Sequence, residues 1–119
     1  MPGPLEGIKV IDVSAVVSGP LAAMILGDQG ADVIKVEPPV TGEVMRLPNF
    51  ERGGLTSLYI NCNRSKRGVA LDLSKPEGVE VMYELVKDAD VFIQNWRPGA
   101  ADRLGLGEEK LREIGRAHV

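Results

Sequence analysis

Four runs of β-branched and other aliphatic residues, separated by longer stretches, constrain the fold of this chain more than any other feature. The runs lie at 8–13, 31–37, 68–73 and 91–94. Runs of this length and composition are typical of buried strands. Because strands that alternate with helices form a mostly parallel sheet with helices on both faces, the sequence predicts an α/β, Rossmann-like fold.

The segments between these runs predict helices and one long loop. A first helix is expected from about residue 20 to residue 27 or 29. A second is expected to begin with Ser74 as its N-cap, with Glu77 completing a capping box, and to continue to about residue 89. Shorter helical segments are expected at 101–104 and 107–114. In the segment 38–56, the hydrophobic residues follow neither the spacing of a helix nor that of a strand, which predicts a functional or flexible loop. Leu55 to Cys62 fits a short helix or an irregular segment.

Composition places the chain among globular proteins. Its 119 residues are 44% hydrophobic and 26% charged, which suffices for one domain with its own core. A net charge of −3 argues against nucleic acid as the main partner, because nucleic acid requires a basic surface. No apolar run approaches the roughly 20 residues that cross a bilayer, and the first residues show no signal-peptide pattern. We therefore expect no membrane association.

The cysteine and histidine content bounds the compartment and the metal chemistry. Cys62 is the only cysteine, so no internal disulfide can form, and a reducing, cytoplasmic location is expected. One thiol and one imidazole, that of His118, are too few for a zinc site, and no metal is expected. A nucleophilic role for Cys62 is disfavoured because the histidine stands at the end of the chain.

The segment 89–103 carries the strongest indication of a ligand site. Its strand ends at Asn95 and Trp96, and Arg97 and Arg103 follow. In an open α/β sheet, ligands bind in the crevice beyond the carboxyl ends of the strands. An amide, an indole and two guanidinium groups favour a flat, anionic, partly aromatic ligand, such as a nucleotide with phosphates. Trp96 alone fits either stacking beside that ligand or packing in the core.

Two further segments have weaker indications. The turn after the first strand contains only Gly19 in place of a G-x-G-x-x-G pattern. This disfavours ordinary NAD binding and fits a tight turn that starts a helix. Arg64, Lys66 and Arg67 form a basic cluster that fits either a solvated turn or a phosphate contact.

Five motifs in a fixed order resemble the amino-terminal part of the family III CoA-transferases. That family includes formyl-CoA and carnitine-CoA transferases and the related methylacyl-CoA racemases. The motifs are PLEGIKVID at 4–12, GP at 19–20, GADVIKVE at 30–37, NRSKR at 63–67 with LDL at 71–73, and the segment 89–99. The resemblance covers about residues 4–114.

This resemblance implies that residues 1–119 form a single Rossmann-like domain that binds coenzyme A, in subunits that interlock as a homodimer. The family positions that contact CoA fall on Val17, Ser18, Leu71, Asp72, Asn95, Trp96, Arg97 and Arg103. Leu71 and Asp72 are expected within the third strand. Val17 stands where the formyl-CoA enzyme has a polar residue, and Pro38 stands where it has a basic one, which weakens the transfer of acyl specificity.

The reaction implied is transfer of CoA from an acyl-CoA to a carboxylic acid through a covalent aspartyl intermediate. The family's catalytic aspartate lies beyond residue 119, so no catalytic residue is expected in this chain. Residues 115–119 also depart from the family pattern. Two alternatives stay open, namely a fragment of a 2-methylacyl-CoA racemase and a non-catalytic nucleotide-binding or interaction module.

Overall fold

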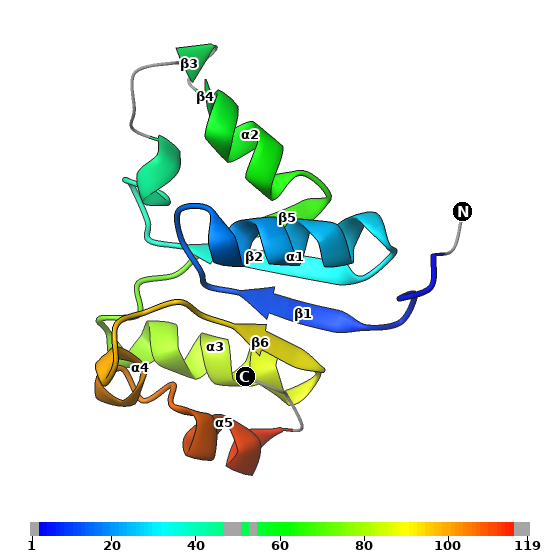
Figure 1. The fold of residues 1–119 in the computed structure, drawn as a ribbon. Helices are drawn as coiled ribbons and strands as arrows, with labels where there is room; N and C mark the ends of the chain where they lie inside the picture. Colours follow the sequence, from blue (N-terminus) through cyan, green and yellow to red (C-terminus); the bar gives the residue numbers. More distant parts are fainter. Residues whose placement is uncertain (1–2, 47–50, 53–54, 116–119) are drawn as a thin grey trace.

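A parallel sheet of four strands forms the centre of the computed structural model, which describes residues 3–46, 51–52 and 55–115 (Figure 1). The strands are β1 (Lys9–Asp12), β2 (Asp32–Glu37), β5 (Lys66–Ala70) and β6 (Val91–Ile93). Their order in the sheet is β5-β2-β1-β6, and each neighbouring pair is parallel. The expected α/β fold is confirmed.

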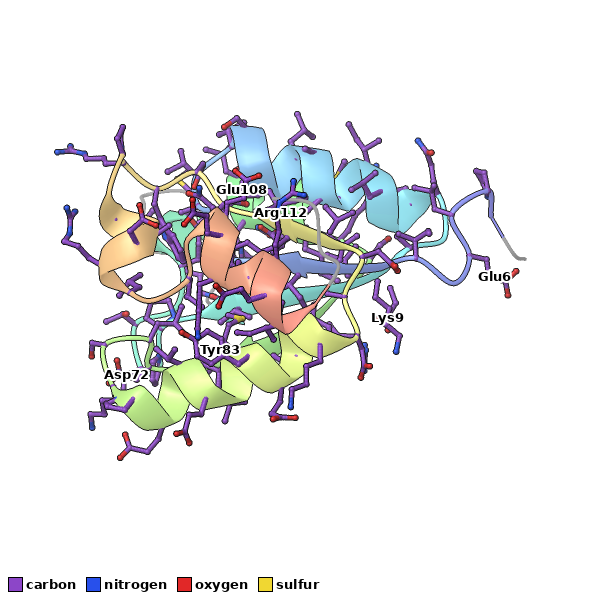
Figure 2. All side chains as sticks on the ribbon, turned by 90° about the horizontal axis from the view of Figure 1, so that it is seen from below. Glu6, Lys9, Asp72, Tyr83, Glu108 and Arg112 are labelled. Carbon is purple, nitrogen blue, oxygen red and sulfur yellow. The ribbon has the colours of Figure 1, made fainter. Side chains whose placement is uncertain are left out.

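Helices cover both faces of this sheet. The helices α1 (Ser18–Asp28) and α3 (Pro76–Lys87) lie on opposite faces, as Figure 2 shows, and α5 (Glu108–Ile114) packs against α3. The short helix α4 (Ala100–Arg103) joins β6 to α5, and α2 (Ser57–Asn63) packs against α1. The remaining elements are η1 (Val44–Arg46), β3 (Glu51–Arg52) and β4 (Leu55–Thr56). None of the described helices is long and apolar enough to cross a membrane.

The core consists of two layers because successive side chains of a strand point to opposite faces. Val10 and Val33 pack with Ala23 of α1 on one face. Ile11 and Phe92 belong to the larger cluster on the other face. The other buried members of that cluster are Val13, Val36, Met82, Val86, Ala89, Leu106 and Leu111. Burial on both faces explains why the strands read as nearly continuous apolar runs.

The third strand differs from the prediction, because it spans Lys66–Ala70 rather than 68–73. Among the described strands it pairs only with β2, and that partner ends at Glu37, opposite Ala70, before two prolines. The ladder cannot continue past its partner. Leu71 and Asp72 therefore follow the strand rather than forming part of it.

The predicted capping box is also wrong. Lys75 is the N-cap of α3 and makes no side-chain capping bond. The Ser74 amide and hydroxyl instead both donate to Asp72 Oδ1, the amide at 3.0 Å, so this serine closes a turn before the helix. Of the two alternatives for 55–62, the helix is the one observed, and the hydroxyl of Thr56 caps it by accepting from the Tyr59 N–H at 3.1 Å.

Candidate functional site

The sheet reverses its strand order at β1, and this reversal defines the candidate site. The chain passes from β1 to β2 on one side, and β6 pairs with β1 on the other. Ligands of open α/β sheets bind at such a switch point, beyond the carboxyl ends of the strands. Two loops meet there, one following β1 at residues 13–17 and one following β6 at residues 94–99.

The Asn95 side chain joins these two loops. Its Oδ1 accepts from the Ala15 N–H at 3.0 Å, and its Nδ2 donates to the Ala15 carbonyl at 2.7 Å. Both ends of the amide are therefore engaged by backbone of the opposite loop. Val17 is 39% exposed beside this contact and serves as the N-cap of α1, and Ser18 is the first residue of that helix. Three of the predicted site residues thus lie together at the switch point.

Gly19 has a packing role in the turn between β1 and α1, where a dinucleotide-binding fold would bind phosphate. A Cβ at this position would lie 2.3 Å from the Cβ of Ser14. The first turn of α1 can therefore approach the end of β1 only if this residue has no side chain. The tight-turn interpretation accounts for the glycine.

A cavity of about 250 Å³ opens at the carboxyl edge of the sheet, and we name it the edge cavity. It brings together Leu71, Asp72 and Trp96, which come from two different loops. Its other lining residues are Val13, Val36, Glu37, Pro38, Leu73, Ser74 and Leu104. In Figure 2, Asp72 lies at the opposite end of the molecule from Lys9, the first residue of β1. The lining is mostly apolar and includes the carboxylates of Glu37 and Asp72, an arrangement common in small-molecule sites.

Trp96 packs against the core, which is one of its two predicted roles, and stacking on a ligand stays a prediction. Its ring packs edge-on against Phe92, with the ring centroids 6.5 Å apart and the planes at 64°. It also lines the edge cavity while remaining half-buried. A ring that the core holds in place is a rigid wall for a flat ligand.

Asp72 presents an ionised carboxylate to this cavity. Hydrogen bonds from the Ser74 hydroxyl and from the Ser74 amide lower the pKa of Asp72 below its ordinary value. The carboxylate therefore accepts hydrogen bonds at neutral pH, as an amino group or a ribose hydroxyl would require.

A second hollow, the adjoining groove, continues from the edge cavity and has a volume of about 540 Å³. The two share Leu73, Ser74 and Leu104. Lys75 and Arg103 line the groove and give it two cationic side chains. Its remaining lining residues are Pro76, Val79, Glu80, Tyr83, Asp102 and Gly105.

Arg97 and Arg103 are both exposed, and neither forms an ion pair with another residue in the described part of the chain. Arg97 lies in the loop after β6 and lines neither hollow, whereas Arg103 lies in α4. Gly99 precedes that helix with φ of 84°, and a Cβ there would lie 3.2 Å from Arg103 Nη1. The glycine thus permits the left-handed turn that leads into α4.

The basic cluster before β5 has its charges satisfied within the protein. Arg64 Nη2 lies 2.8 Å from Asp28 Oδ2, and Arg67 Nη2 lies 2.7 Å from Asp32 Oδ2. Lys66 is buried and is considered below. All three cations have carboxylate partners within the chain, and a phosphate contact by this cluster stays a prediction.

Sequence reasoning missed a network of buried charges under the site. Lys66 Nζ lies 2.7 Å from Asp12 Oδ2, and Lys35 Nζ lies 4.0 Å from the same atom. Burial lowers the pKa of Lys66, and the hydrogen bond to Asp12 opposes that shift. The signal available was the presence of Asp12 and Lys35 inside otherwise apolar strands, where a charge is buried only when it has a partner.

Glu37 is the centre of a second buried group. It accepts from Arg46 Nε at 2.7 Å, from the Tyr59 hydroxyl at 2.8 Å and from the Glu43 N–H at 2.7 Å. Burial raises the pKa of Glu37, but these hydrogen bonds outweigh it and lower the pKa to about 2. Burial and the adjacent Glu37 carboxylate raise the pKa of Tyr59. In the part of the chain with described structure, no three potential metal-ligating side chains come together.

The family model for CoA-transferase family III matches residues 5–117, which is nearly the whole chain. The chain belongs to this family. It is 43% identical over 113 residues to a Homo sapiens succinyl-CoA:glutarate CoA-transferase, covering 93% of this chain and 26% of that protein. It is 41% identical over 115 residues to an Escherichia coli O6:H1 formyl-CoA:oxalate CoA-transferase, covering 96% of this chain and 28% of that protein.

A crystal structure of a CAIB/BAIF family protein from Brucella suis superposes with a TM-score of 0.90 at 37% identity, covering 97% of this chain and 32% of that one. The CoA-transferase family III chain described here thus spans about a quarter to a third of the length of these relatives. The resemblance found in the sequence motifs is confirmed.

Proposed function

We propose that this chain is the CoA-binding portion of an acyl-CoA:carboxylate CoA-transferase. The adenosine end of CoA would occupy the edge cavity, with its ring against Trp96 and Leu71 and its polar edge toward Asp72. Its phosphates would lie over the adjoining groove, where Arg103 donates to them, and Arg97 would contact them from the loop after β6. Guanidinium groups suit this task because they form paired hydrogen bonds with phosphate oxygens.

The observation that carries this proposal is the convergence of Leu71, Asp72, Trp96 and Arg103 on two connected hollows at the carboxyl edge of the sheet. A wider groove between α3 and α5, of about 620 Å³, is lined by Glu77, Glu80 and Glu84 together with Lys87 and Lys110, and none of the predicted site residues lines it. The edge cavity and its groove combine the Trp96 ring with the Arg103 guanidinium, which supports their assignment to a ligand that has an aromatic ring and phosphates.

The substrate class follows from the two relatives, which both exchange CoA between an acyl-CoA and a carboxylic acid. Their names favour transfer over the racemase alternative. We propose a covalent aspartyl intermediate for this transfer, with the aspartate supplied from outside these 119 residues, because a carboxylate nucleophile divides the exchange into two easier steps. A cytoplasmic homodimer is part of the same proposal.

Calorimetric titration of the chain with CoA tests the binding function, with NAD as the comparison ligand. We expect saturable binding of CoA and none of NAD, since the glycine pattern for a dinucleotide is missing. Absence of CoA binding would contradict the proposal.

An assay of the full-length protein containing this chain separates the three functional alternatives. Succinyl-CoA with free glutarate or oxalate should give the exchanged thioester, detected by chromatography. Racemisation of a 2-methylacyl-CoA without exchange would favour the racemase, and CoA binding without either reaction would favour a non-catalytic module.

A further inference from the structure

Glu43 is a buried acid that the proposed CoA site does not itself use. It is 4% exposed, and its Oε1 accepts from the Val16 N–H at 2.8 Å, across 27 positions of sequence. Its second oxygen, Oε2, is buried and has no hydrogen-bond partner among the residues that the structure describes. A buried polar atom without a partner is unfavourable for folding. A residue kept under that disadvantage calls for a role beyond packing.

The partner of Glu43 is the most unusual backbone position in the loop after β1. Val16 has φ of 72°, in the left-handed region that β-branched residues rarely adopt. Such conformations persist only where the surroundings impose them, and they occur mostly at ligand sites. Val16 directly precedes Val17 and Ser18, which begin α1 and are among the predicted CoA contacts.

Glu43 is itself fixed to the sheet. Its N–H donates to Glu37 Oε2 at 2.7 Å, and Glu37 is the last residue of β2. Arg46 holds the same carboxylate through Nε at 2.7 Å and Nη2 at 2.9 Å. A continuous chain of short contacts thus runs from the carboxyl end of β2 through Glu43 to Val16.

We propose that Glu43 is a positioning residue for ligand binding. By accepting the Val16 N–H, it holds residues 16–18 in the conformation that presents the start of α1 to the ligand at the switch point. This inference rests on the proposed CoA-binding function. In this proposal, a residue of the loop after β2 fixes the conformation of the loop after β1.

Two substitutions separate this role from a purely structural one. Glu43→Met has nearly the same length, removes the acceptor and also removes the unpartnered oxygen, so the thermal midpoint should stay constant or rise. Hydrogen exchange at the Val16 amide should nevertheless become roughly tenfold faster, because the bond that protects it is lost. The dissociation constant for CoA should rise by about five- to tenfold, because the loop must be ordered on binding.

Glu43→Gln supplies the rescue, because its amide oxygen can accept the Val16 N–H. Exchange and CoA affinity should both return to within about twofold of the unsubstituted chain. Glu109→Ala, an exposed acid on α5, controls for the loss of one negative charge and should change neither measurement.

Each contrary outcome is informative. Slow Val16 exchange in Glu43→Met overturns the proposal, as does faster exchange with unchanged CoA affinity. Loss of the folded state in Glu43→Met also overturns it, because the residue would then be needed for folding itself. Failure of the unsubstituted chain to bind CoA contradicts the proposed function, whereas the exchange experiment needs no ligand and still decides whether Glu43 orders the loop.

Discussion

The charged residues of this protein include buried groups that neutralise one another and exposed arginines that form no ion pair among the described residues. Asp12 and Lys66 form a buried pair 2.7 Å apart, and Lys66 Nζ also donates to the Pro20 carbonyl at 3.0 Å. Such a pair is tolerated only when its remaining hydrogen-bonding capacity is used. Arg97 and Arg103 stand at the carboxyl edge without carboxylate partners among the described residues. They are therefore suited to an anionic ligand.

Replacing Arg103 with alanine tests the phosphate contact. A charged hydrogen bond contributes about 1.5–3 kcal/mol, so Arg103→Ala should raise the Kd for CoA by roughly 10- to 150-fold in calorimetry. Arg112→Ala is the matched control, because Arg112 pairs with Glu108 on α5, as labelled in Figure 2, and should leave the Kd unchanged. An unaltered Kd in Arg103→Ala would remove this residue from the site.

Among single residues, the sequence predicted those whose side-chain type itself suggests contact with a ligand. Trp96 lies in the loop after β6 and Arg103 lies in α4 beyond that loop, and each lines a hollow. Glu43 and Arg46 lie in the segment 38–56, which has no regular hydrophobic spacing. Nothing in that segment predicts that both contact Glu37 or that Glu43 also contacts Val16. Their role comes from contacts between loops, which a local pattern cannot contain.

Among the elements, the strands and helices differ in how well their patterns predicted them. The aliphatic runs identified β1, β2 and β6 closely. The start of β5 was missed because Lys66 and Arg67 resemble a polar turn. Their charges are compatible with a strand only because Asp12 and Asp32 in other strands neutralise them. Pairing partners distant in sequence decided this boundary.

The junction of β1 and α1 provides a test at the scale of elements. Gly19→Ala places a Cβ against Ser14, so we expect a loss of about 1–3 kcal/mol in the free energy of unfolding, as for other overpacked positions. Urea denaturation measures it. Gly68→Ala is the comparison, because a Cβ there meets nothing within 4 Å. Equal stability of the two variants would show that α1 can move away from β1 without lowering the free energy of unfolding.

The stability of the whole molecule should depend on pH through Glu37. Its pKa in the folded chain, about 2, lies below the ordinary value of 4.5. The unfolded chain therefore binds the proton first on acidification, and stability present above pH 4.5 is lost progressively as the pH falls toward 2. Glu37→Gln should flatten this part of the profile.

Urea midpoints measured across that pH window provide the check. Glu84→Gln is the control, because Glu84 is exposed and pairs only with Lys87 on its own helix among the described contacts. Parallel profiles for the unsubstituted chain and Glu37→Gln would contradict the assignment of this pH dependence to Glu37.

The charges on β5 also bear on how the protein avoids aggregation. This strand is at the edge of the sheet, and a regular edge is a template on which another chain can add a strand. Arg67 keeps its guanidinium exposed there, and Lys66 is tied inward to Asp12. A strand added at this edge would have to bury the charge of Arg67. Separating β5 from the sheet would remove Lys66 from its partner, Asp12. Lys66 and Arg67, which form ion pairs with other strands of the sheet, therefore also disfavour edge-to-edge assembly.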